Sequence, residues 1–194
     1  MPWVADRARL RDRAAQLVRE SWSELKLSQD FGNGERTSLR RIHFGMNKLI
    51  QLGCEDTSPL IAEILCNDPW LVRDPSWVVE GLAVQGLSHE LETILDFNAN
   101  KDDATGEFVR AVTIRGLQFL STITTSQWRK IVQYATGGSI VERLLATETW
   151  LQLGDACDGM VNDGDVSTLK AMIVESPEQN SRLRKKLHSP SWSI

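Results

Sequence analysis

The histidines and cysteines, which most often bind zinc or act as general base or activated nucleophile, are few and widely separated. They are three histidines and three cysteines: His43, His89, His188, Cys54, Cys66 and Cys157. None stands at the C-x-x-C or H-x-x-x-H spacing that brings two zinc ligands together. His89 precedes Glu90, but adjacent residues of a helix point in different directions, so we interpret the two as solvated. We therefore expect no metal site, no cofactor and no catalytic residue.

An aspartate- and glycine-rich run near the C-terminus superficially resembles a calcium loop. Residues 154–165 are GDACDGMVNDGD, in which Asp155 and Asp158 fall three apart. An EF-hand loop alternates its ligands and closes with a glutamate, and this run does neither. We interpret these residues as helix caps and turns, and we keep calcium binding as a minor hypothesis.

The composition indicates a folded domain without the charge pattern of a nucleic acid binder. The 194 residues include 22 basic and 26 acidic ones, for a formal net charge of −4, so we expect no nucleic acid partner. No apolar run approaches the roughly 18 residues that cross a bilayer, and the N-terminus lacks a secretory signal. The odd, scattered cysteines suit reduced thiols. These features predict an intracellular protein, cytoplasmic or nuclear, that does not contact membranes.

The chain begins with an amphipathic helix. Between Ala5 and Leu25, apolar residues recur at spacings of three and four, with arginines and acidic residues interleaved. The following segment, Ser28 to Thr37, is rich in Asp, Asn and Gly and has the composition of a flexible connection. We therefore predict an N-terminal helix and connection at residues 1–35, a helical domain at 36–186 and a flexible tail at 187–194.

Beyond this connection, helical patterns alternate with Gly, Asp, Asn and Pro. The segment from Val109 to Ile123 is the most β-like, and we interpret it as a helix. Two segments repeat one another: LIAEILCNDPWLVRD (60–74) and LETILDFNANKD (91–102) place their Ile-Leu pairs 30 residues apart, at 64 and 94. Between them, WVVEGLAVQG (77–86) indicates a short helix that ends on a glycine in the left-handed conformation.

These segments resemble the ankyrin repeat, in which an outer helix, a protruding turn and an inner helix recur. YATGGSIVERLLA (134–146) and NDGDVSTLKAMIVESPE (162–178) are similar to later units of the same kind. The resemblance implies an all-α, solenoid-like stack of helical hairpins that follows the N-terminal amphipathic helix. An unrelated array of helical hairpins and an irregular α-bundle remain the alternative folds.

The sequence also departs from the ankyrin pattern. Ser76-Trp77-Val78-Val79 replaces the family's Thr-Pro-Leu-His box, so the family's histidine hydrogen bond is absent. The next Leu-Leu pair, 144–145, lies 50 residues beyond Leu95, which indicates that one unit between about 104 and 133 is inserted or diverged.

A stack of this kind predicts a continuous apolar core, because one helix pair cannot bury its own apolar stripe. The predicted core residues are Leu60, Ile61, Ile64, Leu65, Leu82, Leu91, Ile94, Leu95, Val141, Leu144, Leu145, Leu169, Met172 and Ile173. Of the seven tryptophans, we assign Trp77, Trp128 and Trp150 to the core. Trp70 follows Pro69 in a turn and is the best candidate for an exposed anchor.

The predicted function is that of a scaffold or adaptor, not an enzyme, which binds a protein partner through its turns and concave face. The predicted contacts are Trp70, Arg73, Asp74, Pro75 and Ser76 from one turn, and Asn100, Lys101, Asp102 and Asp103 from the next. One alternative is a helical subunit or effector fragment that docks through its N-terminal helix. The other is a small hydrolase that pairs Cys157 with His89 or His188.

Overall fold

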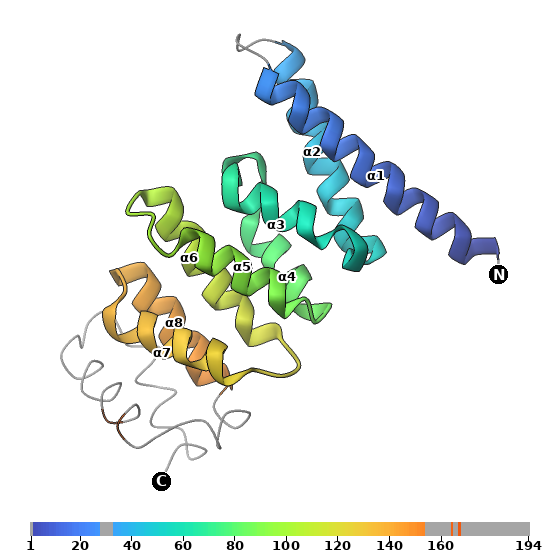
Figure 1. The fold of residues 1–194 in the computed structure, drawn as a ribbon. Coiled ribbons are helices and arrows are strands. Elements are labelled where there is room, and N and C mark those ends of the chain that lie inside the picture. Colours follow the sequence, from blue (N-terminus) through green and yellow to red (C-terminus); the bar gives the residue numbers. More distant parts are fainter. Residues whose placement is uncertain (1, 28–32, 154–163, 165–166, 168–194) are drawn as a thin grey trace.

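The computed structural model describes residues 2–27, 33–153, 164 and 167, and within these ranges every regular element is a helix, which confirms the all-α class (Figure 1). The α-helices are α1 (Pro2–Leu27), α2 (Asn33–Leu52), α3 (Ser58–Asn67), α4 (Pro75–Val84), α5 (Ser88–Asn98), α6 (Ala104–Gly116), α7 (Thr125–Gly137) and α8 (Ile140–Leu153). Single 3-10 turns lie between some of them: η1 (Glu55–Thr57), η2 (Pro69–Leu71) and η3 (Leu117–Phe119).

The helices pack mainly on near neighbours in the chain. Helix α1 runs along α2, and α7 along α8. The even-numbered helices contact one another in order, α2 with α4, α4 with α6 and α6 with α8, while α3 packs on α5. Figure 1 shows this progression from the α1–α2 hairpin at the upper right to α7 and α8 at the lower left. From α4 to α6, each helix thus shares its apolar face with helices on both sides.

The predicted N-terminal helix is confirmed as α1, and it is integrated with α2. Ala14, Val18 and Trp22 are buried on its inner face. Arg7 donates from Nε to the Leu52 carbonyl oxygen (2.8 Å), so a guanidinium group satisfies a carbonyl left open at the C-terminus of α2. Removing α1 would therefore expose the apolar face of α2. If a truncated chain failed to bind a partner, the failure could come from the lost docking helix or from the lost packing.

The predicted connection from Ser28 to Thr37 extends too far. Helix α2 already begins at Asn33, so Gly34 and Thr37 are helical. A glycine such as Gly34 inside a helix costs only about 1 kcal/mol relative to alanine. The packing of α2 along α1 outweighs this cost.

The core forms from the faces that the apolar pattern predicted in α3, α4 and α5, but not in α8. Leu60, Ile61, Ile64, Leu65, Leu82, Leu91, Ile94 and Leu95 are all buried as predicted. In α8, however, Val141 and Leu144 are exposed and Leu145 is only half-buried. Helix α8 instead buries Glu142, Ala146 and Trp150, because the face that carries Glu142 meets α6. Leu169, Met172 and Ile173 lie outside the described residues.

The tryptophans divide between core and surface. Trp128 and Trp150 are buried as predicted, and their rings meet edge to face with centroids 5.0 Å apart. Trp77, also predicted as core, is only half-buried, because its ring lies at the surface between α2 and α4. Trp70 is 60% exposed, which confirms its assignment to the surface.

Two local predictions concern the helix ends. Gly86 closes α4 with φ of +74°, and the Leu87 N–H donates to the Leu82 carbonyl oxygen (3.0 Å), so the predicted glycine stop is confirmed. The segment from Val109 to Ile123 is helical through Phe119, in α6 and η3, and non-helical after it. The helical interpretation of this segment is therefore confirmed for all but its last four residues.

Glycines occupy the points where successive helices come closest. A methyl group on Gly116 of α6 would overlap Val79 of α4, and one on Gly81 of α4 would overlap Ile50 of α2. The distance between two packed helices is set by the side chains at their contact. Gly81 and Gly116 therefore allow α2, α4 and α6 to approach closely.

Replacing Gly116 by alanine is expected to lower the free energy of unfolding by about 1–2 kcal/mol, measured by urea denaturation. The overlap with Val79 costs more than the helix propensity gained from alanine. Adding Val79→Ala removes the overlapping methyl group, so the double variant should lose less than the sum of the two single losses. Gly137→Ala is the matched control, because a methyl group there meets no atom within 4 Å. Additive losses in the double variant would contradict the proposed close approach.

Candidate protein-binding groove

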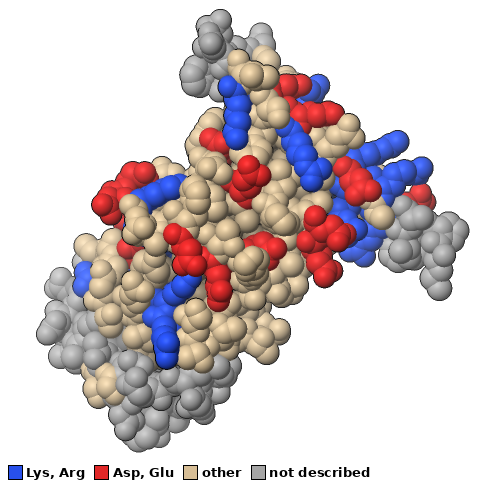
Figure 2. Space-filling model, viewed as in Figure 1, with Lys and Arg blue, Asp and Glu red and all other residues tan. Residues whose placement is uncertain are grey.

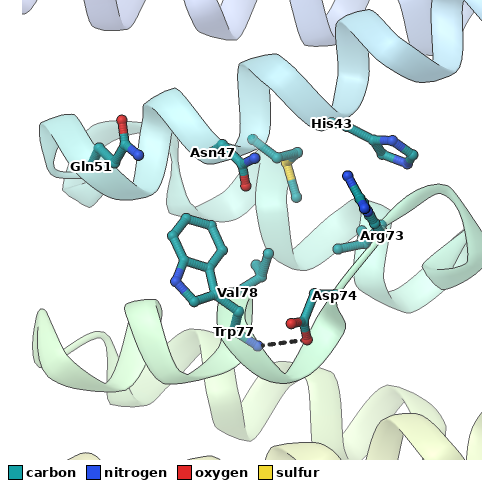
Figure 3. Close-up of a pocket in the computed structure, with 9 residues that line it drawn as sticks. His43, Asn47, Gln51, Arg73, Asp74, Trp77 and Val78 are labelled. Carbon is teal, nitrogen blue, oxygen red and sulfur yellow. Dashed lines mark hydrogen bonds between the residues drawn. The ribbon is translucent and has the colours of Figure 1, made fainter.

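A groove of about 400 Å³ lies between α2 and the turn that leads from η2 into α4 (Figure 3). Its floor is apolar and consists of Met46, Val72 and Val78, all buried. Its walls are polar or aromatic: His43, Asn47 and Gln51 come from α2, and Arg73, Asp74 and Trp77 from the opposite side. An apolar floor between polar walls is typical of surfaces that bind one or a few side chains of another molecule.

The α2 wall of the groove follows from helix periodicity. His43, Asn47 and Gln51 are spaced by four residues, so they lie above one another on one face of α2. The opposite wall is held by the start of α4, where the Asp74 carboxylate accepts a hydrogen bond from the Trp77 N–H (3.1 Å) and Pro75 occupies the first turn. In Figure 3 the Trp77 indole points toward α2 below Asn47, and the Arg73 side chain extends toward His43.

Two residues of the first predicted contact turn line this groove. Arg73 and Asp74 are exposed and line it, and Trp70 lies in η2, which packs on α2. Ser76 is half-buried. Pro75 is buried as the first residue of α4, so we remove it from the contact surface.

Lys101 anchors the second predicted turn to the end of α3. Its Nζ donates to the Cys66 carbonyl oxygen at the end of α3 (2.7 Å) and lies 4.3 Å from the centroid of the Phe97 ring. Asp103 caps α6 by accepting from the Gly106 N–H (2.6 Å). Asn100 and Asp102 are exposed and available for contact, whereas Lys101 is engaged within the fold.

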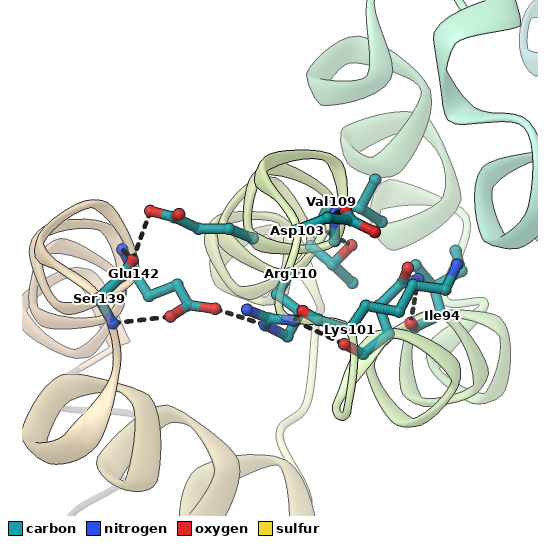
Figure 4. Close-up of polar contacts among 11 residues, drawn as sticks. Ile94, Lys101, Asp103, Val109, Arg110, Ser139 and Glu142 are labelled. Atoms are coloured by element: carbon teal, nitrogen blue, oxygen red, sulfur yellow. Dashed lines mark hydrogen bonds and ion pairs between the residues drawn. The ribbon is translucent and has the colours of Figure 1, made fainter.

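A polar network connects this second turn to α8 (Figure 4). Arg110 of α6 is 8% exposed, forms an ion pair with Glu142 of α8, and donates to the carbonyl oxygens of Asn98 (2.6 Å) and Lys101. Burial alone would raise the pKa of Glu142, but hydrogen bonds from the Ser139 N–H and from Arg110, together with the charge of Arg110, lower it below the ordinary value. The pair is therefore charged at neutral pH, and it holds the second predicted turn against the start of α8.

The network was not predicted from the sequence, although one signal for it is present. Ser139 and Glu142 have the S-x-x-E spacing of a capping box, and both of its hydrogen bonds form: the Ser139 N–H to Glu142 Oε2 (2.7 Å) and the Glu142 N–H to Ser139 Oγ (3.3 Å). Ser139 Oγ also donates to Glu107 (2.6 Å). The spacing thus marks the start of α8 and one end of the network.

The described thiols are poor candidates for a nucleophile. Burial raises the pKa of Cys54 and of Cys66 to about 11, so both are protonated at neutral pH. His89 lies with Cys66 and Glu90 along a second cavity of about 300 Å³ between α3 and α5. The proposed hydrolase pair cannot be placed, because Cys157 and His188 lie outside the described residues.

Within the part of the chain that the structure describes, no three or more His, Cys, Asp or Glu side chains are grouped to hold a metal ion. Of the calcium-like run at 154–165 only residue 164 is described, and the tail at 187–194 lies outside that part. Over the same residues, no helix is both long and apolar enough to cross a membrane. Comparisons with family models, with curated proteins and with solved structures give no match to this chain.

Proposed function

We propose that this chain is an ankyrin-like stack of helical hairpins that works as a protein-interaction scaffold, with the groove between α2 and α4 holding a segment of the partner. The stack is supported by a regular step: α3 and α5 begin 30 residues apart, at Ser58 and Ser88, and α4 and α6 begin 29 apart, at Pro75 and Ala104. The ordered contacts of α2, α4, α6 and α8 support it as well.

The observation that carries the binding proposal is the groove itself. Trp77 is half-buried beside a buried apolar floor, and Arg73 stands free at the rim, with no ion pair to another described residue. Tryptophan and arginine dominate the energetics of protein interfaces when a partner covers them. Of the contact surface that we propose, Arg73, Asp74 and Trp77 line the groove. Trp70 and Ser76 of the same turn, and Asn100, Asp102 and Asp103 of the next turn along the chain, are predicted from the sequence to extend it.

The proposal is tested by selecting peptides from a phage-displayed library on the wild-type protein. Selected peptides are expected to bind about tenfold more weakly to the variant Asn47→Trp, measured by fluorescence anisotropy, because the new indole fills the groove. Gln133→Trp is the matched control, since it adds the same side chain to an exposed position of α7. Peptides that bind Asn47→Trp as tightly as the wild type would show that the groove is not the binding site.

A further inference from the structure

We infer that the partner segment held in this groove is acidic, with its carboxylates at the His43 and Arg73 end and an apolar side chain over Trp77. This inference rests on the proposed function and specifies its ligand. It follows from how charge is distributed over the described residues, and from which cations at the groove have no partner within the fold.

The described chain is electrically polarised. Residues 2–27 and 33–52, which form α1 and α2, carry ten basic and five acidic side chains, for a net charge of +5. Residues 53–153 carry seven basic and fourteen acidic side chains, for a net charge of −7. Figure 2 shows basic side chains gathered over the α1–α2 hairpin at the right of the view. The groove lies between this basic hairpin and the acidic part of the molecule. Its α2 wall belongs to the basic hairpin, so an anion is attracted to that wall.

Two arginines extend the groove wall along α2. Arg36 and Arg40 precede His43 by seven and three residues, so helix periodicity places them on the same face as His43 and Asn47. Both arginines are exposed. From Gln51 toward the N-terminus, this face therefore carries two amides, then His43, then two arginines, and Arg73 extends toward His43 from across the groove.

These cations are available for a partner. Arg11 and Arg41 pair with Asp56 and Glu24, whereas Arg36, Arg40 and Arg73 form no ion pair with any residue that the structure describes. The one carboxylate that lines the groove, Asp74, already accepts the hydrogen bond that caps α4. The charge surplus at this end of the groove is thus positive, and a carboxylate is the natural partner of a free guanidinium group.

A peptide fits these observations better than a membrane surface. A helix that lies on a membrane needs a broad apolar face beside its cations. The outer face of α2 offers only Phe44 as an exposed large apolar residue. The groove, in contrast, has a concave apolar floor of the size that one or two side chains fill. The acidic part of the molecule, residues 53–153, would also be repelled by an extended anionic surface.

The test uses the full chain and a fluorescein-labelled peptide built from a repeated Glu-Glu-Leu unit. We expect anisotropy to show saturable binding that weakens as salt rises, and no binding of the analogue with lysine in place of glutamate. Arg40→Glu and Arg73→Glu should each weaken binding about tenfold. Arg129→Glu, the same charge change at an exposed position of α7, should leave it unchanged. Arg40→Gln, which adds no negative charge, should weaken binding by a smaller factor.

Each other result overturns the inference in a recognisable way. Suppose that the library peptides whose binding is weakened by Asn47→Trp prove neutral or basic, and that the Glu-Glu-Leu peptide does not bind. The scaffold function then stands, and the proposed acidic ligand is wrong. If vesicles containing phosphatidylserine or a single-stranded oligonucleotide bind through Arg40 while the peptide does not, the ligand belongs to another class. If Arg73→Glu abolishes a self-association seen by sedimentation, the anionic partner is a second copy of the chain.

Discussion

Replacing Arg110 by alanine is expected to lower the free energy of unfolding by about 3–5 kcal/mol, measured by urea denaturation. The arginine is buried and pairs with Glu142, so its removal leaves a buried carboxylate without its counter-charge. It also leaves the carbonyl oxygens of Asn98 and Lys101 without this donor. A domain of this size has a total stability of about 5–15 kcal/mol, so the variant should be near the limit of folding.

Two further variants identify the cause of that loss. Arg143→Ala removes an exposed arginine from α8, beside Glu142, and should change stability by no more than about 0.5 kcal/mol. Adding Glu142→Gln to Arg110→Ala should recover part of the loss, because a neutral amide is less costly to bury without a partner than a carboxylate. If the double variant is less stable than Arg110→Ala alone, the buried charge is not what destabilises the single variant.

The same pair has a consequence for the pH dependence of folding. The folded state lowers the Glu142 pKa below its ordinary value of 4.5, so its stabilising contribution is complete above that pH. As the pH falls through the lowered pKa, the carboxylate is protonated and the contribution is lost. The Glu142→Gln chain should therefore lack this part of the acid sensitivity of the wild type.

The helices and much of the core could be predicted from the sequence because both follow from the spacing of apolar residues. The Ile-Leu pairs of α3 and α5 and the positions Ala14, Val18 and Trp22 of α1 are local patterns, and the structure buries them, whereas Leu10 of α1 is exposed. The glycine at 86 was predictable for a similar reason, since a left-handed helix stop favours glycine. Local patterns failed in α8, where Val141 and Leu144 suggested one face and a distant partner selected another.

The network and the α2 wall of the groove could not be predicted, because both depend on contacts between residues far apart in the chain. Arg110 and Glu142 are 32 residues apart, and a charged residue in a helical pattern ordinarily indicates solvent exposure. The groove likewise joins Asn47 of α2 to the turn at Arg73, and only the turn has a local signal. The sequence therefore indicated one wall of the groove and not the other.

Replacing Leu95 by aspartate is expected to abolish the cooperative thermal melt. Leu95 is 1% exposed on α5, which packs against α3, α4 and α6. The change removes a buried side chain, at about 2–5 kcal/mol, and places an unpaired carboxylate in its position, at several kcal/mol more. The sum is comparable with the whole stability of a domain, so the chain should unfold rather than lose a single contact.

A matched variant separates the effect of burial from that of charge. Phe97→Asp, two residues along the same helix, also replaces a large apolar side chain by aspartate, but Phe97 is 48% exposed. Water can solvate the new carboxylate there, so we expect a cooperative melt with a loss of about 1 kcal/mol. A cooperative melt of Leu95→Asp near the wild-type temperature would show that this side of α5 does not face the core. Helix α5 packs against α3 and α4 before it in the chain and against α6 after it. That result would therefore also remove the support for the proposed stack.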